Sequence, residues 1–145
     1  MIVAAYQGFS PEGNIKSALA TVDKTLAKAA NENVEMIVFP GYNQMKSHPV
    51  VAQKQGGTWE TKLAALAKKH GCGLTIGWAE RDGDSIYNSA STFDRAGTKL
   101  AHFRKIQLWG KTEQEIFEFV TSMFPTARPI TESISGMRKF EVNKA

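Results

Sequence analysis

In the first forty residues the pattern of hydrophobic positions changes from that of a strand to that of a helix and back. The opening run MIVAAYQG, residues 1–8, is apolar enough for a buried strand, and a helix over residues 11–31 follows, with Ser10 as its predicted N-cap. Apolar residues of this helix recur at spacings of four, three and four positions: Ile15, Leu19, Val22 and Leu26. The nearly continuous apolar run over residues 34–39 predicts a second strand, covered on both faces. This β–α–β order requires two parallel strands joined by a right-handed crossover.

The next segment repeats this pattern once and then changes to short turns. TWETKLAALAKKH, residues 58–70, predicts a second helix with Thr58 as its cap. A third strand, over residues 73–79, comes directly after it. Strands over residues 86–93 and 98–104 follow, and the turns RDGD and DRAG that precede them are too short to hold a helix. A β-meander is therefore added to the β–α–β–α–β start.

Two segments have weaker patterns. Residues 43–57 contain Pro49 and end in a Gly-Gly pair, and they predict at most a short helix. KTEQEIFEF, which follows Gly110, predicts a loop with one helical turn. Over residues 118–145 the period fades, and Gly136 interrupts the one helical spacing there, so we predict no particular element for this tail.

The order of elements predicts an α/β fold built on one twisted, mixed sheet. Both long helices are expected on one face of that sheet. The opposite face is expected to be apolar and uncovered, and an exposed apolar face of that size favours association of two chains.

Composition fits one globular domain. The chain has 145 residues, of which 42% are apolar and 22% charged, values that exclude wholesale disorder. No apolar run approaches the roughly 18 residues of a membrane span, so we predict no membrane partner. The N-terminus lacks the basic lead-in of a signal peptide, and the one cysteine, Cys72, permits no internal disulfide. Both features suit a reducing cytoplasm.

Neither the charge distribution nor the possible metal ligands indicate a binding partner. The net charge is +4, from 18 basic and 14 acidic residues, but the lysines are scattered among the acids. We interpret the run Lys68-Lys69-His70 as a solvated helix end and predict no nucleic-acid partner. The three histidines, at positions 48, 70 and 102, are too widely spaced for a metal site, and Cys72 fits a small buried hydrophobe. We therefore predict no metal cofactor.

The most informative stretch is HFRKIQLWGKTEQEIF, residues 102–117. A predicted strand ends in Arg-Lys, an apolar segment follows, and Glu113 stands eight positions after Lys105. An ammonium at a strand end could be buried and held by a carboxylate, and Glu113 is the nearest candidate. Lysine and glutamate are also common on surfaces, so the pair alone is more typical of a solvated surface than of a site.

With its flanks, this stretch resembles the nitrilase superfamily of carbon–nitrogen hydrolases. The matching features are IVAAYQ, Asn14 at the start of the first helix, MIVFP, LAKKHGCGLTIGWAER, IYNSASTFDRAGTKLAHFRKIQL and EQEIF. The most specific are the Tyr87-Asn88 pair and the RK-x-x-L segment. On this basis residues 1–117 are identified as the N-terminal part of a carbon–nitrogen hydrolase-like domain, and residues 118–145 as a divergent C-terminal tail.

The resemblance implies a fold and a reaction. The family fold is an α-β-β-α sandwich, of which this chain would supply part, and family members commonly pair with a second subunit. The family hydrolyses non-peptide C–N bonds of small amides or nitriles with a Glu base, a Cys nucleophile and a Lys that stabilises the tetrahedral intermediate, helped by a second Glu. A thiol needs a base and a developing oxyanion needs fixed positive charge, so this division of roles is chemically coherent. By motif position Lys105 matches the family lysine, and Glu113 matches the supporting glutamate.

The chain departs from the family at the two other site positions. The family's second strand ends in Pro-Glu, whereas here Pro40 is followed by Gly41. The family cysteine comes after the lysine, but no cysteine follows Cys72, and MFPTAR (residues 123–128) only faintly resembles the stretch beyond the nucleophile. These departures predict a truncated and inactive hydrolase. The alternative is a non-catalytic binding module that reuses the sheet, and we expect a homo-oligomer formed through the exposed sheet face.

Overall fold

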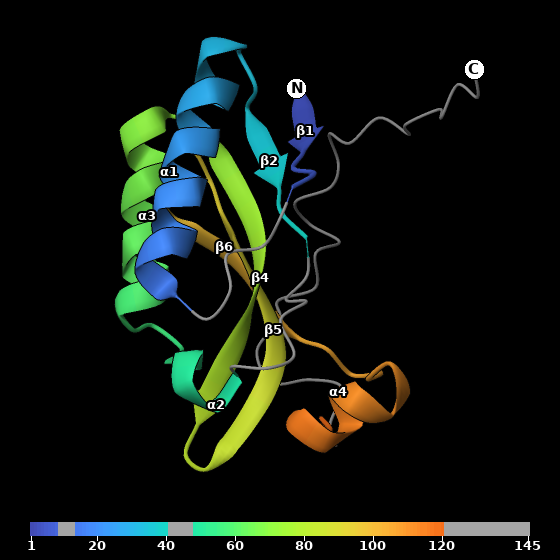
Figure 1. The fold of residues 1–145 in the computed structure, drawn as a ribbon. Coiled ribbons are helices and arrows are strands. Elements are labelled where there is room, and N and C mark those ends of the chain that lie inside the picture. The colour runs from blue at the N-terminus through green and yellow to red at the C-terminus, as the bar shows by residue number, and fades with distance from the viewer. Residues whose placement is uncertain (9–13, 41–47, 121–145) are drawn as a thin grey trace, which may run out of the picture.

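The computed structural model describes residues 1–8, 14–40 and 48–120 (Figure 1). In chain order its elements are β1 (Val3–Ala5), α1 (Ile15–Asn31), β2 (Met36–Val38), α2 (His48–Val51), β3 (Gln53–Lys54), α3 (Thr58–His70), β4 (Gly73–Asp82), β5 (Ser85–Phe93), β6 (Lys99–Arg104) and α4 (Gly110–Ile116).

All six of these strands form one sheet, in the order β1-β2-β4-β5-β6, with β3 paired to β4. The first strands are parallel, and β4, β5 and β6 are antiparallel, so the predicted mixed sheet is confirmed. The short helix expected within residues 43–57 is α2. The prediction that this segment holds nothing else is wrong, because Gln53 and Lys54 pair in parallel with Glu80 and Arg81. A two-residue strand has no period of its own and exists only through that pairing.

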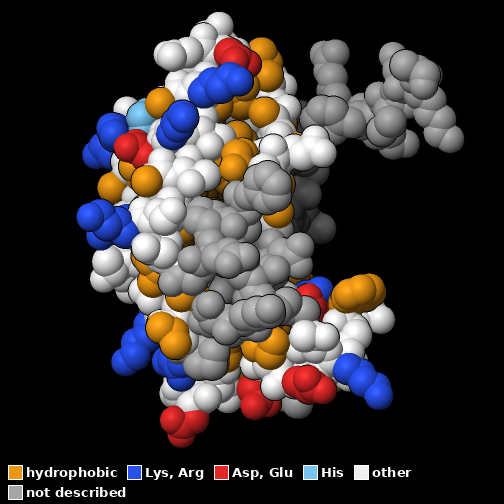
Figure 2. Space-filling view, viewed as in Figure 1, with side chains coloured by type: hydrophobic (Ala, Val, Ile, Leu, Met, Phe, Trp, Pro, Cys, Tyr) orange, Lys and Arg blue, Asp and Glu red, His pale blue; other side chains and the backbone are white. Residues whose placement is uncertain are grey.

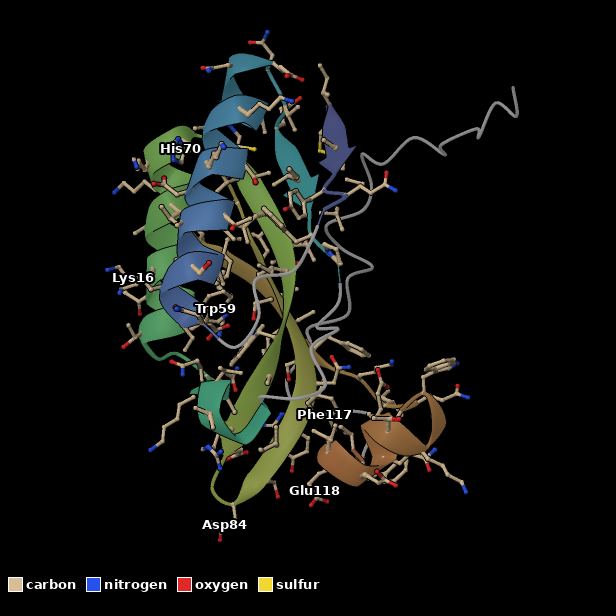
Figure 3. All side chains as sticks on the ribbon, viewed as in Figure 1. Lys16, Trp59, His70, Asp84, Phe117 and Glu118 are labelled. Atoms are coloured by element: carbon tan, nitrogen blue, oxygen red, sulfur yellow. The ribbon has the colours of Figure 1, made fainter. Side chains whose placement is uncertain are left out.

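Both long helices cover the same face of the sheet, as predicted (Figure 1). The core between them and the sheet contains fully buried leucines from each layer: Leu26 in α1, Leu63 in α3 and Leu74 in β4. Trp59, labelled in Figure 3, belongs to the same core. Helix α3 ends at His70, and Gly71 follows with a φ of 61°, the left-handed conformation typical of a residue just after a helix.

The helix caps differ from those predicted. Helix α1 begins at Ile15, because the side chain of Asn14 accepts a hydrogen bond from the backbone N–H of Ser17 at 3.1 Å. The predicted start at residue 11 is therefore wrong, and the predicted cap, Ser10, lies outside the described residues. Thr58 is the first helical residue of α3 and does not cap it; Gly57 occupies the cap position without a side chain.

The sheet face opposite the long helices is more varied than predicted. Its middle carries small residues, and the hydroxyls of Thr75 and Thr92 lie 2.9 Å apart across β4 and β5. Apolar side chains are exposed toward its edges, with exposed fractions of 40% for Val38 and 54% for Phe103. The expected apolar face is therefore interrupted at its centre by a cross-strand pair of threonines.

Helix α4 covers one end of that opposite face. Leu108 and Phe117 pack there on Ala79 of β4, together with half-buried Ile86. Phe117 and Glu118, labelled in Figure 3, lie beside the end of the sheet where β4 turns into β5, and the N–H of Glu118 donates to the carbonyl of Ile86 at 2.8 Å. This second cluster fixes α4 against the sheet. The predicted single helical turn is thus a helix of seven residues.

The outer surface is polar along the long helices. Figure 2 shows lysine and arginine side chains along the side that α1 and α3 form. At the end of α3, Lys69 Nζ and His70 Nε2 lie 2.8 Å and 2.6 Å from Asp23 Oδ1 of α1. The predicted solvated helix end is therefore held to the neighbouring helix by the Lys69 ion pair and the His70 contact. In the ranges that the structure describes, no helix is long and apolar enough to span a membrane.

Candidate functional site

The structure brings the two predicted site residues together. Lys105 directly follows β6, and Glu113 lies in the first turn of α4. Lys105 Nζ donates to both carboxylate oxygens of Glu113, at 2.9 Å and 2.7 Å. A separation of eight residues along the chain is closed because α4 folds back onto the sheet. The geometry establishes the pair, while its catalytic role remains a prediction.

Backbone pairing at the end of the sheet fixes the position of Lys105. Its backbone N–H donates to the carbonyl of Asn88 in β5 at 2.7 Å, which continues the ladder one residue beyond β6. Arg104 lies on the helix-covered face beside Ser89, so Lys105 projects to the opposite face. Its side chain is 36% exposed, so the lysine is partly open to solvent.

The glutamate is held more tightly than the lysine. Glu113 is 9% exposed, and besides Lys105 it accepts a hydrogen bond from the backbone N–H of Trp109 at 2.6 Å. Asn88 Nδ2 donates to Glu113 Oε1 at 3.3 Å. Burial by itself raises the pKa of Glu113, but the hydrogen bonds from Lys105, Trp109 and Asn88 outweigh it and hold the pKa below its ordinary value. Glu113 is therefore an anion that fixes the direction of the ammonium.

This arrangement offers a fixed positive charge. A half-exposed ammonium, oriented by a buried carboxylate, can stabilise negative charge that develops on a bound oxygen or nitrogen atom. The single cysteine does not contribute. Cys72 is fully buried before β4, burial raises the pKa of its thiol, and it packs in the core under the long helices. Asn88, by contrast, pairs with Ala79 near the other end of β4.

Two of the histidines each contact one carboxylate in the described part of the structure. His70 contacts Asp23, and His102 Nε2 lies 2.7 Å from Glu80 Oε2. Among the described residues no group of three possible metal ligands is close enough to hold an ion. The side chain of the third histidine lies outside the described part of the chain.

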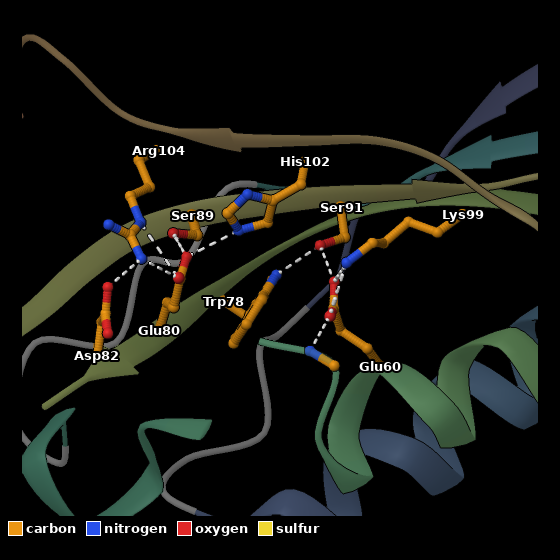
Figure 4. Close-up of polar contacts among 10 residues, drawn as sticks. Glu60, Trp78, Glu80, Asp82, Ser89, Ser91, Lys99, His102 and Arg104 are labelled. Carbon is orange, nitrogen blue, oxygen red and sulfur yellow. Dashed lines mark hydrogen bonds and ion pairs between the residues drawn. The ribbon is translucent and has the colours of Figure 1, made fainter. Parts of the chain in front are cut away.

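A buried polar network lies on the helix-covered face, and sequence reasoning missed it (Figure 4). Its centre is Glu80, which is completely buried in β4. Its carboxylate accepts from Ser89 Oγ at 2.6 Å and from Arg104 Nε at 3.1 Å, and it contacts His102. Burial alone raises the pKa of Glu80, but the hydrogen bonds from His102, Arg104 and Ser89 lower it to about 2.

A second buried carboxylate, Glu60 of α3, lies on the same face with hydrogen-bond partners of its own. Glu60 accepts from Ser91 Oγ at 2.6 Å and from Lys99 Nζ at 3.1 Å. Burial favours a raised pKa, yet the hydrogen bonds, first from Ser91, leave the pKa of Glu60 below its ordinary value. Trp78 Nε1 donates to the same serine at 3.0 Å. The sequence did contain a sign of these buried carboxylates, because Glu60 and Glu80 stand at positions that face the apolar core. Their partners, however, follow only from the strand register.

Comparison with known proteins identifies the relatives of this chain. The sequence model of the family Carbon-nitrogen hydrolase matches residues 2–142. A nitrilase from Pyrococcus abyssi is 31% identical over 131 residues, which cover 81% of this chain and 48% of that protein. A protein described as "Hydrolase in pqqF 5'region", from Pseudomonas protegens, is 27% identical over 86% of this chain and 46% of its own length.

Solved structures agree in fold. An amidase from Nesterenkonia sp. superposes with a TM-score of 0.73 at 21% identity, over 83% of this chain and 48% of the amidase chain. A mutant of the amidase from Nesterenkonia sp. AN1, solved in complex with butyramide, gives a TM-score of 0.72 at the same identity. The chain therefore spans about half the length of the relatives that it matches.

Proposed function

Because the chain belongs to the carbon–nitrogen hydrolase family, we propose that it carries the lysine half of a site for hydrolysis of small amides or nitriles. The observation that carries this proposal is the Lys105–Glu113 pair. Its ammonium is half-exposed, bound by both carboxylate oxygens and located at a strand end. The amidase and nitrilase names among the relatives support the substrate class.

Each member of the pair has a separate task in this proposal. Lys105 Nζ faces the oxygen of an amide, or the nitrogen of a nitrile, as negative charge develops there during attack on the carbon. Glu113 keeps the ammonium oriented and stays ionised, because its pKa lies below the ordinary value. Asn88 fixes the carboxylate in turn, since its amide donates to Glu113 Oε1.

The chain alone should not turn over substrate. It contains one cysteine, Cys72, and that thiol is buried in the core with a raised pKa. The residue after Pro40 is Gly41, where the family has its general base. Loss of a nucleophile costs several orders of magnitude in turnover even when the other site residues remain, since such groups act as a unit.

Ammonia release from a panel of small amides and nitriles tests this proposal. The wild-type chain is compared with Lys105→Ala and Cys72→Ala. We expect no release above the uncatalysed background from any of the three proteins. Release that requires both Lys105 and Cys72 would show that the chain builds a nucleophilic site of its own, and the proposal would be wrong.

Exposed apolar side chains support a second role, as a non-catalytic module that associates with itself in the cytoplasm. Trp109 is 77% exposed, Phe103 54% and Val38 40%, and all belong to the sheet face opposite the long helices or to the segment that covers its end. We propose that two copies meet through this face, because burying it removes apolar surface from water. Light scattering should then report a dimer that Phe103→Ser weakens. A wild-type monomer at every concentration would contradict association.

A further inference from the structure

Two neighbouring residue pairs interlock at the end of the sheet. They are Tyr87-Asn88 in β5 and Arg104-Lys105 at the end of β6. Consecutive residues in a strand point to opposite faces. On the helix-covered face, the Arg104 guanidinium lies 4.0 Å from the centre of the Tyr87 ring. On the other face, Asn88 contacts the same Glu113 that binds Lys105.

Arg104 is fixed from three sides. Its Nε donates to Glu80 Oε1 at 3.1 Å, and its Nη2 donates both to that oxygen and to Asp82 Oδ2, the latter at 2.8 Å (Figure 4). Tyr87 provides the third contact through its ring. Glu80 cannot move away from the guanidinium, because it is fully buried and also held by Ser89. A planar guanidinium bound in this way has one orientation.

The anchor acts on the next residue. In the described sheet β6 is the last strand, so its end is held through β5 alone. The final backbone bond, from Lys105 N–H to the Asn88 carbonyl, directly follows the anchored residue. With Arg104 fixed on one face, the peptide between the two residues is fixed as well. Its orientation sets the direction in which Lys105 leaves the strand.

We propose that Arg104, held by Glu80 and Asp82, is a positioning residue for Lys105. In this proposal the buried network on the helix-covered face determines where the ammonium lies relative to Glu113 on the opposite face. This inference rests on the proposed function of Lys105, but its test needs no turnover. Failure of hydrolysis and failure of the positioning role are therefore separate results.

Competitive acetylation with a limiting amount of acetic anhydride, read for each lysine by mass spectrometry, tests the proposal. Lys99 provides an internal control. It is the first residue of β6, the strand that Lys105 directly follows. Its side chain is 34% exposed against 36% for Lys105, and it also binds a buried glutamate, Glu60. Arg104→Gln should raise the acetylation rate of Lys105 by about tenfold, the factor that corresponds to loss of one charge-assisted hydrogen bond. The rate at Lys99 should stay within about twofold, since sites without shared partners respond independently.

Two further variants complete the design. Glu113→Gln removes the partner of Lys105 directly and gives the upper limit of the rate increase. Asp82→Asn removes one contact of Arg104 from a side chain that is 64% exposed, so the variant retains the buried part of the network. It should raise the rate at Lys105 by about threefold, because the Glu80 contacts remain. Arg95→Lys, at an exposed arginine, should leave the rate at Lys105 unchanged.

A rise confined to Lys105 in Arg104→Gln and Asp82→Asn supports the positioning role. Equal rises at Lys105 and Lys99 would show that Arg104 serves only general stability, and the proposal would be overturned. An unchanged rate at Lys105 would overturn it too. If Arg104→Gln does not fold, as judged by circular dichroism, Asp82→Asn decides the question alone by the same two outcomes.

Discussion

Replacing Glu80 by glutamine should lower stability at neutral pH and make the protein less sensitive to acid. Glu80 is completely buried and faces Arg104 and His102, while Ser89 donates to the same carboxylate. Glutamine keeps the shape of the side chain but not its charge. Arg104 would then have no buried counter-charge, and an uncompensated buried charge is strongly destabilising.

The size of the effect follows from the pKa of Glu80. Hydrogen bonds from His102, Arg104 and Ser89 outweigh the effect of burial and lower that pKa from 4.5 to about 2. A depression of this size corresponds to about 3 kcal/mol of unfolding free energy at neutral pH. Because the folded pKa is the lower one, this contribution is complete above about pH 5 and is lost as the pH falls toward 2. By about pH 3 less than half of it remains.

Urea unfolding at several pH values between 7 and 3, followed by tryptophan fluorescence, measures this contribution. The difference in unfolding free energy between wild type and Glu80→Gln should be about 3 kcal/mol at pH 7 and shrink steadily below pH 5. Other depressed carboxylates, such as Glu60 and Glu113, act equally in both proteins and cancel in the difference. Glu115→Gln, at an exposed position of α4, is the matched control and should change little. A difference that is independent of pH would refute the reasoning.

Three substitutions test the packing and the backbone of the fold by the same unfolding measurement. Leu63→Ala removes a fully buried side chain between α3 and the sheet and should cost about 2–5 kcal/mol; a loss below about 1 kcal/mol would contradict the assigned core. Asn14→Ala removes the cap of α1 and should cost about 1 kcal/mol, whereas an unchanged stability would argue against Asn14 as the cap. Gly97→Ala should cost about 1–3 kcal/mol, since Gly97 has a φ of 82° and an added Cβ would collide with the Ala64 carbonyl oxygen; a neutral result would mean that the β5–β6 turn packs elsewhere.

The sequence predicted the elements whose signal is local. Periodic apolar positions identified α1 and α3, and short turns identified the hairpins of β4, β5 and β6, because hydrophobic period and turn length are read directly from the chain. The cap of α1 was misplaced because Ser10 and Asn14 are both good cap residues, and only the backbone at Asn14 distinguishes them. Strand β3 has two residues and no period, so pattern reasoning could not find it.

Only part of the candidate site could likewise be predicted from the sequence. Lys105 and Glu113 could be paired from their motif positions in a resembling family and from their eight-residue spacing. The hydrogen bonds that Asn88 and the Trp109 N–H donate to Glu113 could not be predicted, because they depend on how α4 folds back onto β5. The buried partners of Glu80 likewise depend on strand register, which places Arg104 and His102 on its face of the sheet.

A double-mutant cycle on Lys105 and Glu113 tests the central claim most directly. Unfolding free energies are measured for wild type, Lys105→Ala, Glu113→Ala and the double variant. Two hydrogen bonds between charged groups, at 2.9 Å and 2.7 Å with the glutamate buried, predict a coupling energy of about 1 kcal/mol or more. The coupling should be the same with Cys72 replaced by alanine, because the thiol lies in the core and not at the pair. A coupling energy of zero within error would mean that the two side chains act independently, and the account of this site would be contradicted.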